Sequence, residues 1–158
     1  AIFYGDFVKL VAAGTVEKAA VTTAVVAGTV GIFVGCSYTD PSTSQLTFNQ
    51  QYPASTTASD IMAYVVDDPK LVFKMQADEA IAQTGLGNNI SAVSTAGSTA
   101  IGRSKNALDG GSIATTNSLP LRVLEFVEGP SSTVGDTYTD CLVTYLPLSH
   151  AYETKLGV

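Results

Sequence analysis

The single histidine is the first residue to test for chemistry. His150 lies in the segment Ser149-His150-Ala151-Tyr152, close to the end of the chain. A Ser-His-Asp system would need this ring beside a nucleophile that a sharp turn holds in place. The nearest match to such a turn, Gly35-Cys36-Ser37-Tyr38-Thr39, ends in Thr where the motif requires Gly. The sequence therefore favours a surface or capping histidine over a catalytic one.

Two adjacent carboxylates, Asp67 and Asp68, could begin a cation site or act as a catalytic pair. Neighbouring residues of a strand point to opposite faces, so the two groups converge only if a turn brings them together. Asp68-Pro69 is itself a common turn opening, in which the Asp side chain accepts local N–H bonds. A turn is the favoured interpretation, with calcium binding and catalysis as the alternatives.

Three further motifs are weak. Gly85-Leu86-Gly87-Asn88-Asn89-Ile90 begins like a dinucleotide-binding loop, but it lacks the third Gly and a long helix after it. Asn89-Ile90-Ser91 is a glycosylation triplet without a secretion signal. Asp109-Gly110-Gly111 is typical of a turn. We therefore expect these segments to be loops without a ligand.

The two cysteines, Cys36 and Cys141, both lie inside apolar runs. This placement predicts buried thiols that act as small hydrophobic side chains, with a Cys36–Cys141 disulfide as the alternative. Their spacing fits no zinc motif. We expect no catalytic residues, no metal, no cofactor and no enzymatic activity.

The composition of the 158 residues limits the partners. Hydrophobic residues make up 46% and charged residues only 14%, while the chain contains 14 Ser and 19 Thr. The net charge of −6 and the scattered Lys and Arg residues leave no basic stripe for phosphates, which argues against nucleic acid and anionic membranes. A surface rich in hydroxyl groups can lie against another protein without desolvating many ions, which favours an assembly role.

The segment 19–39 carries no charge and must be tested as a membrane span. Its several Thr and Gly residues argue against a span, and Val30, Ile32, Val34 and Cys36 alternate as one face of a strand would. We expect two strands joined near Ala27-Gly28. The N-terminal residues lack a basic start and an apolar core, so we expect no signal peptide and a cytoplasmic origin.

Short apolar runs bounded by Gly, Pro, Asp and hydroxyl residues predict an all-β fold. The expected architecture is a single β-barrel or β-sandwich domain, residues 1–158, with at most one short helix at 78–83. We expect strands at 6–12, 16–21, 29–38, 45–52, 61–66, 70–77, 113–116, 121–128 and 137–146, with 61–77 forming a hairpin. The remainder is an N-terminal arm (1–5), a long loop (85–111) and a C-terminal arm (147–158).

Three stretches carry a resemblance to a known family: Val30 through Tyr38, Val66 through Gln76, and Gly97 through Asp109. In them the chain resembles the head decoration (cement) proteins of tailed bacteriophages. The resemblance implies a β-barrel-like virion protein, made in the host cytoplasm, that binds the major capsid protein on the outer capsid surface. It also implies homo-oligomers, with trimers favoured, that stabilise capsomer contacts, and no catalytic residues.

Three other functions stay open at this point. The first is a receptor- or carbohydrate-binding β-sandwich module of a fibre or adhesin. The second is a tail-tube or pilin-like subunit, and the third is an enzyme, which the empty motif search disfavours. For a cement protein, the β core would be the rigid body, and the arms 1–5 and 147–158 and the loop 85–111 are the candidate contacts. Deleting residues 1–5 or the final ten residues should weaken assembly or capsid binding but leave the core folded.

Overall fold

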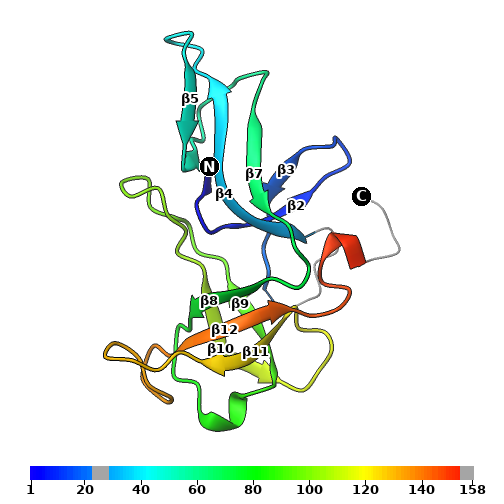
Figure 1. Ribbon diagram of the computed structural model, residues 1–158, viewed down its shortest axis with the longest axis vertical. Helices are drawn as coiled ribbons and strands as arrows, with labels where there is room; N and C mark the ends of the chain where they lie inside the picture. Colours follow the sequence, from blue (N-terminus) through cyan, green and yellow to red (C-terminus); the bar gives the residue numbers. More distant parts are fainter. Residues whose placement is uncertain (23–28, 154–158) are drawn as a thin grey trace.

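The computed structural model describes residues 1–22 and 29–153 (Figure 1). Within them the secondary structure is almost entirely β, and the helices are two short 3₁₀ turns, η1 (Gln83–Gly85) and η2 (Ala151–Glu153). The all-β prediction is confirmed. No helix in this part of the chain has the length and hydrophobicity that a membrane span requires. The expected junction at Ala27-Gly28 lies outside the described residues.

The upper half of the molecule in Figure 1 is a sheet built around one long strand. Its strands are β2 (Phe7–Leu10), β3 (Val16–Lys18), β4 (Thr29–Thr39), β5 (Leu46–Asn49) and β7 (Met62–Val66). Ile32 of β4 pairs with both β2 and β7, and Cys36 pairs with both β5 and β7. Thus β2 and β5 follow one another along one edge of β4, and β7 occupies the other edge.

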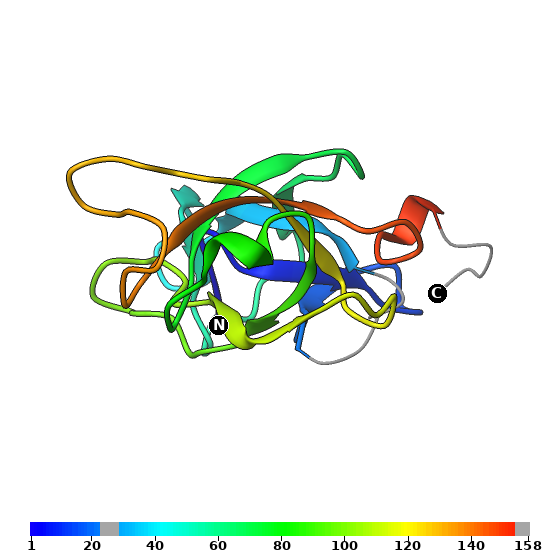
Figure 2. The same cartoon turned by 90° about the horizontal axis from the view of Figure 1, so that it is seen from below.

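The lower half is a second sheet, in the order β10-β9-β11-β12-β8. Its strands are β8 (Val72–Gln76), β9 (Asn89–Val93), β10 (Ala107–Ala114), β11 (Leu121–Phe126) and β12 (Asp140–Tyr145). Ala77 forms a parallel bridge with Leu108, and the Asp78 N–H donates to the Leu108 carbonyl at 2.9 Å. These contacts join the two end strands, so the sheet curls around its own core, as the view from below shows (Figure 2).

Each half has its own hydrophobic core. The lower core contains Ile90, Leu121 and Val143, and the upper core contains Val8 and Phe33 among its buried residues. The two halves are joined because β2 and β4 contribute to both. Phe7 belongs to the lower core, where its ring packs edge-on against Phe73 and Tyr145.

The hairpin predicted for 61–77 is wrong. The two strands exist, as β7 and β8, but β7 pairs with β4 in the upper sheet and β8 pairs with β12 in the lower one. The segment Asp67-Asp68-Pro69 therefore belongs to the connection that carries the chain from the upper sheet to the lower one. The alternation predicted for β8 is confirmed, with Phe73 and Met75 packed against the core and Lys74 exposed.

The long loop predicted for 85–111 is also wrong, because this segment contains β9 and the first half of β10. Four of the five residues of β9 are buried, including Asn89 and Ser91, so no alternation between apolar and polar residues marks the strand. The expected turn at Asp109-Gly110-Gly111 is an irregularity inside β10, where the register to β9 shifts. The strand expected at 113–116 is the end of β10.

The short helix expected at 78–83 does not form. Its backbone donors serve the sheet, since the Asp78 N–H bonds to Leu108 and the Ile81 N–H bonds to the Thr139 hydroxyl. The strand expected at 45–52 is divided at Gln50 into β5 and β6 (Gln51–Tyr52). The strands β2, β3, β4, β11 and β12 confirm the predictions at 6–12, 16–21, 29–38, 121–128 and 137–146.

Neither predicted arm is free where the structure describes it. The residues Ile2–Phe3 form β1, which pairs with β6, and Phe3 is only 6% exposed. At the other end, Ser149 and His150 are buried ahead of η2, while residues 154–158 lie outside the described part. Removing either terminus would therefore take away core contacts, contrary to the expectation from sequence.

Candidate interaction surface

His150 is fully buried and so is not a surface histidine, but the capping alternative is confirmed, because the ring directly precedes η2 and accepts the Tyr152 N–H of its first turn. Its Nε2 lies 3.0 Å from the Val30 carbonyl oxygen, and its Nδ1 accepts the Tyr152 N–H at 3.2 Å. Because a carbonyl only accepts and an N–H only donates, these contacts define a neutral ring with the proton on Nε2. The histidine thus ties the C-terminal segment to β4 as a structural group.

Asp67 and Asp68 behave as turn residues, as predicted. The Lys70 N–H donates to Asp68 Oδ1 at 2.8 Å, which is the local bond of an Asx turn. The Tyr152 hydroxyl donates to Asp67 Oδ2 at 3.0 Å. Tyr152 therefore lies between Asp67 and the buried His150 ring. Through these contacts the C-terminal segment is attached to the connection that follows β7.

The two thiols are free and buried in different cores, as predicted, with Cys36 in the upper core and Cys141 in the lower one. Burial raises the pKa of Cys36 above its ordinary value. Burial, with a smaller contribution from the negative charge of Asp140, raises the pKa of Cys141 to about 11. Both groups are therefore protonated and poorly nucleophilic at neutral pH.

We expect the stability of the protein to fall as the pH rises from 9 towards 11. The folded chain keeps the Cys141 proton up to about pH 11, whereas an exposed thiol loses it near its ordinary value of 9.0. Below pH 9 this contribution is complete, and it is lost as the pH rises through the folded pKa. Urea unfolding at several pH values should show a shallower decline for Cys141→Ala, and equal slopes would contradict the assignment.

The remaining motifs serve the fold. Asn89 is buried, its Nδ2 donates to the Thr116 carbonyl oxygen, and its Oδ1 accepts from Arg122 Nε, so the glycosylation triplet is closed to a transferase. Gly85 and Gly87 belong to the tight connection from η1 to β9. The Gly87 N–H donates to the Val123 carbonyl of β11, so this N–H is already bonded within the fold and does not point to a phosphate.

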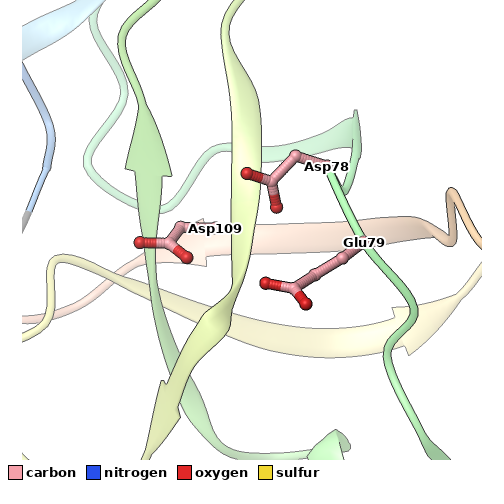
Figure 3. Close-up of side chains that lie close together, drawn as sticks. All are labelled: Asp78, Glu79 and Asp109. Atoms are coloured by element: carbon pink, nitrogen blue, oxygen red, sulfur yellow. The ribbon is translucent and has the colours of Figure 1, made fainter.

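One cluster was missed from the sequence. Asp78, Glu79 and Asp109 each place a carboxylate oxygen within 4.8 Å of the others (Figure 3). Asp78 and Glu79 come from the segment after β8 and Asp109 from β10, so only the closure of the lower sheet brings them together. Asp78 accepts the Gly110 N–H and Asp109 accepts the Ser91 hydroxyl.

This acidic cluster has the donor type that hard cations prefer, but Asp78 and Glu79 are exposed. Calcium takes about six to eight oxygen ligands, so three surface carboxylates would need several waters to complete the shell. The hydrogen bonds from Gly110 and Ser91 already stabilise two of the three charges. We therefore interpret the three carboxylates as a surface cluster that the fold itself stabilises, and we assign no cation to them.

A group of exposed apolar side chains lies on the outer side of β5, β4 and β7. Phe48 of β5 is 70% exposed and Met62 of β7 is 62% exposed, and both pair with Ser37 of β4. Cross-strand partners project from the same side of a sheet, so these side chains share one face. The exposed large side chains of this face are Leu46, Phe48, Met62, Tyr64 and Val66; we call it the outer face.

The outer face is hollowed between β5 and β7. A depression of about 280 Å³ lies between Phe48 and Tyr64, with Val34 and Gly35 among the residues that line it. The Tyr64 hydroxyl and the Ser37 hydroxyl share a hydrogen bond of 2.9 Å across β7 and β4. The other side of the same strands carries the upper core, so the apolar groups of the outer face are not needed to build that core.

Charge is almost absent around this face. Residues 29–66 contain no Lys, Arg or Glu, and their only charged residues are Asp40 and Asp60. Hydrogen bonds from Ser42 lower the pKa of Asp40, and hydrogen bonds from Thr39 lower the pKa of Asp60, so both carboxylates are occupied in local structure. A partner could cover the outer face without desolvating an unpaired ion on the face itself.

An exposed apolar sheet face of this kind is a candidate interaction surface. Comparison of the chain with protein-family models, with curated proteins and with solved structures gives no match in any of the three. The geometry described above is therefore the basis for assigning a function.

Proposed function

We propose that this chain is a structural, non-enzymatic virion protein that binds the outer surface of a tailed-phage capsid and stabilises capsomer contacts. The observation that carries the proposal is the outer face: exposed Leu, Phe, Met, Tyr and Val side chains on β5 and β7, within a stretch, 29–66, that contains no Lys or Arg. Contiguous apolar patches of this kind on a soluble protein mark sites of association.

The resemblance in Val30–Tyr38 and Val66–Gln76 supports the phage head as the place of binding; the first stretch lies within β4, and the second runs from the last residue of β7 to the end of β8. We propose the major capsid protein as the partner and a trimer as the working oligomer. Many copies bound to a regular surface need only modest affinity each, because avidity multiplies the effect. The mass of the free protein in solution tests the trimer directly.

We expect Phe48→Lys to weaken binding to phage heads at least ten-fold. The substitution places a charge at the most exposed position of the outer face, and desolvating that charge opposes association by about 1.4 kcal/mol or more. Heads produced without this protein are mixed with purified chain, and the bound fraction is measured by co-sedimentation over a range of concentrations. The expected result is saturable binding by the wild-type chain.

The matched control is Leu124→Lys, because Leu124 is an exposed apolar residue of β11 in the lower half. Its binding curve should equal that of the wild type, and both variants should keep the wild-type unfolding temperature. Equal loss of binding in both variants would reject the outer face as the contact. Wild-type chain that sediments no better with heads than without them would reject the proposed function.

A further inference from the structure

The strand β7 presents a free backbone edge. Within the described residues its ladder is formed with β4 alone, and no other backbone hydrogen bond involves Met62–Val66. An open edge is a template for another strand, and proteins usually protect such edges with charges, Pro or bulges inside the strand. The sequence Met-Ala-Tyr-Val-Val contains none of these, whereas the edge strand β3 carries Glu17 and Lys18.

A cavity of about 350 Å³ adjoins the start of this strand, where Met62 of the outer face also contributes to its lining. Its lining is largely apolar and includes Ile2, Val16, Phe33, Tyr52, Ile61 and Ala63. The cavity thus lies between the start of β7 and the β2–β3 hairpin, which contributes Gly14 and Val16. A cavity of about 150 Å³ already admits benzene, so this one can hold a large aliphatic or aromatic side chain.

Carboxylates stand at both ends of the free edge. Asp60 lies just before β7, and Asp67 and Asp68 follow it directly. None of the three forms an ion pair among the described residues, and the chain has no Lys or Arg between Lys18 and Lys70. An occupant with positive charges at its ends would therefore be attracted at either end of the strand.

We propose that β7 is a strand-addition site that takes an extended segment of the protein partner, apolar at alternate positions and flanked by Lys or Arg. This inference rests on the proposed function and assigns the chemistry of the capsid segment that is bound. Backbone hydrogen bonds to β7 supply the attachment, and one inward side chain enters the cavity, which is how strand addition gains specificity.

A second copy of the chain does not fit this edge. Antiparallel pairing of β7 with its own copy would bring Asp60 of one chain close to Asp67 and Asp68 of the other. Parallel pairing would place each acid beside its own counterpart. Like charges facing one another oppose both arrangements, so a partner with basic flanks is favoured over self-association. The edge strand β5 is also uncharged, but it does not line the cavity.

The test uses the full chain, isotope-labelled, and a short peptide with alternating Val and Thr, one central Phe and Lys at both ends. NMR titration should shift the amide signals of Met62–Val66 and slow their hydrogen exchange. Glu in place of both terminal Lys residues should weaken binding about ten-fold. Peptides with alternate backbone amides N-methylated, or with Ala in place of Phe, should bind more weakly still or not at all.

A matched pair of chain variants checks the charges. Asp67→Asn keeps the acceptor for Tyr152 but removes one flanking charge, and it should weaken the Lys-ended peptide about two-fold. Asp40→Asn, at the exposed turn after β4, should have no effect. Unchanged β7 signals with every peptide, or equal affinity for the Lys-ended and N-methylated peptides, would overturn the inference.

An experiment with phage heads distinguishes a failure of this inference from a failure of the proposed function. The exchange of the β7 amides is measured again on chain bound to phage heads. Bound chain with β7 amides that exchange as in the free protein rejects strand addition and leaves the proposed function standing. Peptide uptake at β7 without any binding to heads rejects the proposed function and retains β7 as a strand-addition site for another partner.

Discussion

Replacing Asp6 by Ala should destabilise the protein by about 3 kcal/mol, which corresponds to a fall in Tm of about 10 °C for a chain of this length. Asp6 is fully buried, and its carboxylate accepts three bonds. The donors are the Phe3 N–H at 2.9 Å, the Ser104 hydroxyl at 2.6 Å and Lys18 Nζ at 3.0 Å. The measurement is urea or thermal unfolding of both proteins at neutral pH.

The size of this effect follows from what the carboxylate joins. Its donors lie on the N-terminal strand, on β3 and in the loop between β9 and β10, and Lys18 also donates to the Thr95 carbonyl. Without Asp6, the buried Phe3 N–H loses its partner and Lys18 loses its counter-ion. A buried donor or charge that is left without a partner costs far more than an exposed one.

The pair Lys9–Glu17 provides the control, because it joins the neighbouring strands β2 and β3 at 2.8 Å but lies at the surface. Its side chains are 34% and 53% exposed, so solvent screens the pair and Glu17→Ala should cost less than about 1 kcal/mol. Similar losses for Asp6→Ala and Glu17→Ala would show that the buried carboxylate has no special role in joining these segments.

The sequence predicts best the strands whose faces differ in exposure. In β8 the alternation of Phe73 and Met75 with Lys74 is visible in the sequence, and it is confirmed. In β9 both faces are buried, and Asn89 and Ser91 are satisfied by partners from distant parts of the chain. Such partners cannot be read from local sequence, so the strand resembles a polar loop.

The strand partners of β7 and β8 could not be predicted from local sequence either, because they too lie far away in the chain. The segments of β7 and β8 are separated by a turn, which usually indicates a hairpin. Here the two strands diverge because the long strand β4 offers a free edge to β7, while β12 offers one to β8. Only the complete set of strands decides between a local partner and a distant one.

The outer face was also hidden in the sequence. Phe48, Met62 and Tyr64 are large apolar residues of a kind that usually lies in a core, so their types alone do not mark them as surface residues. Their exposure depends on the register of β5 and β7 against β4, which turns them away from the upper core. The lack of Lys and Arg from 29 to 66 is visible in the sequence. It points to an interaction surface only when the structure shows that the exposed apolar residues of this segment lie on one face.

Among the glycines that the structure describes, Gly31 should be the least tolerant of Ala: Gly31→Ala should destabilise the protein by on the order of 4 kcal/mol, since overpacking and backbone strain both contribute. Gly31 has φ +151°, and a Cβ there would lie 2.1 Å from the Val66 carbonyl oxygen and 2.9 Å from Val65 Cγ1. The backbone of β7 would have to move away from β4, because a carbonyl oxygen cannot rotate aside as a side chain can.

Gly129→Ala is the matched control, because a Cβ at Gly129 meets nothing within 4 Å, and unfolding of this variant should match the wild type. The strand β4 shifts register against β2 between Thr29 and Gly31 and against β7 between Phe33 and Gly35, so Val30, Ile32, Val34 and Cys36 do not share one face as predicted. As a result, Ile32 packs on the lower core, while Phe33 and Cys36 lie in the upper one. A Gly31→Ala protein as stable as wild type, with unchanged amide exchange in Met62–Val66, would mean that β7 is not held against β4 in this register.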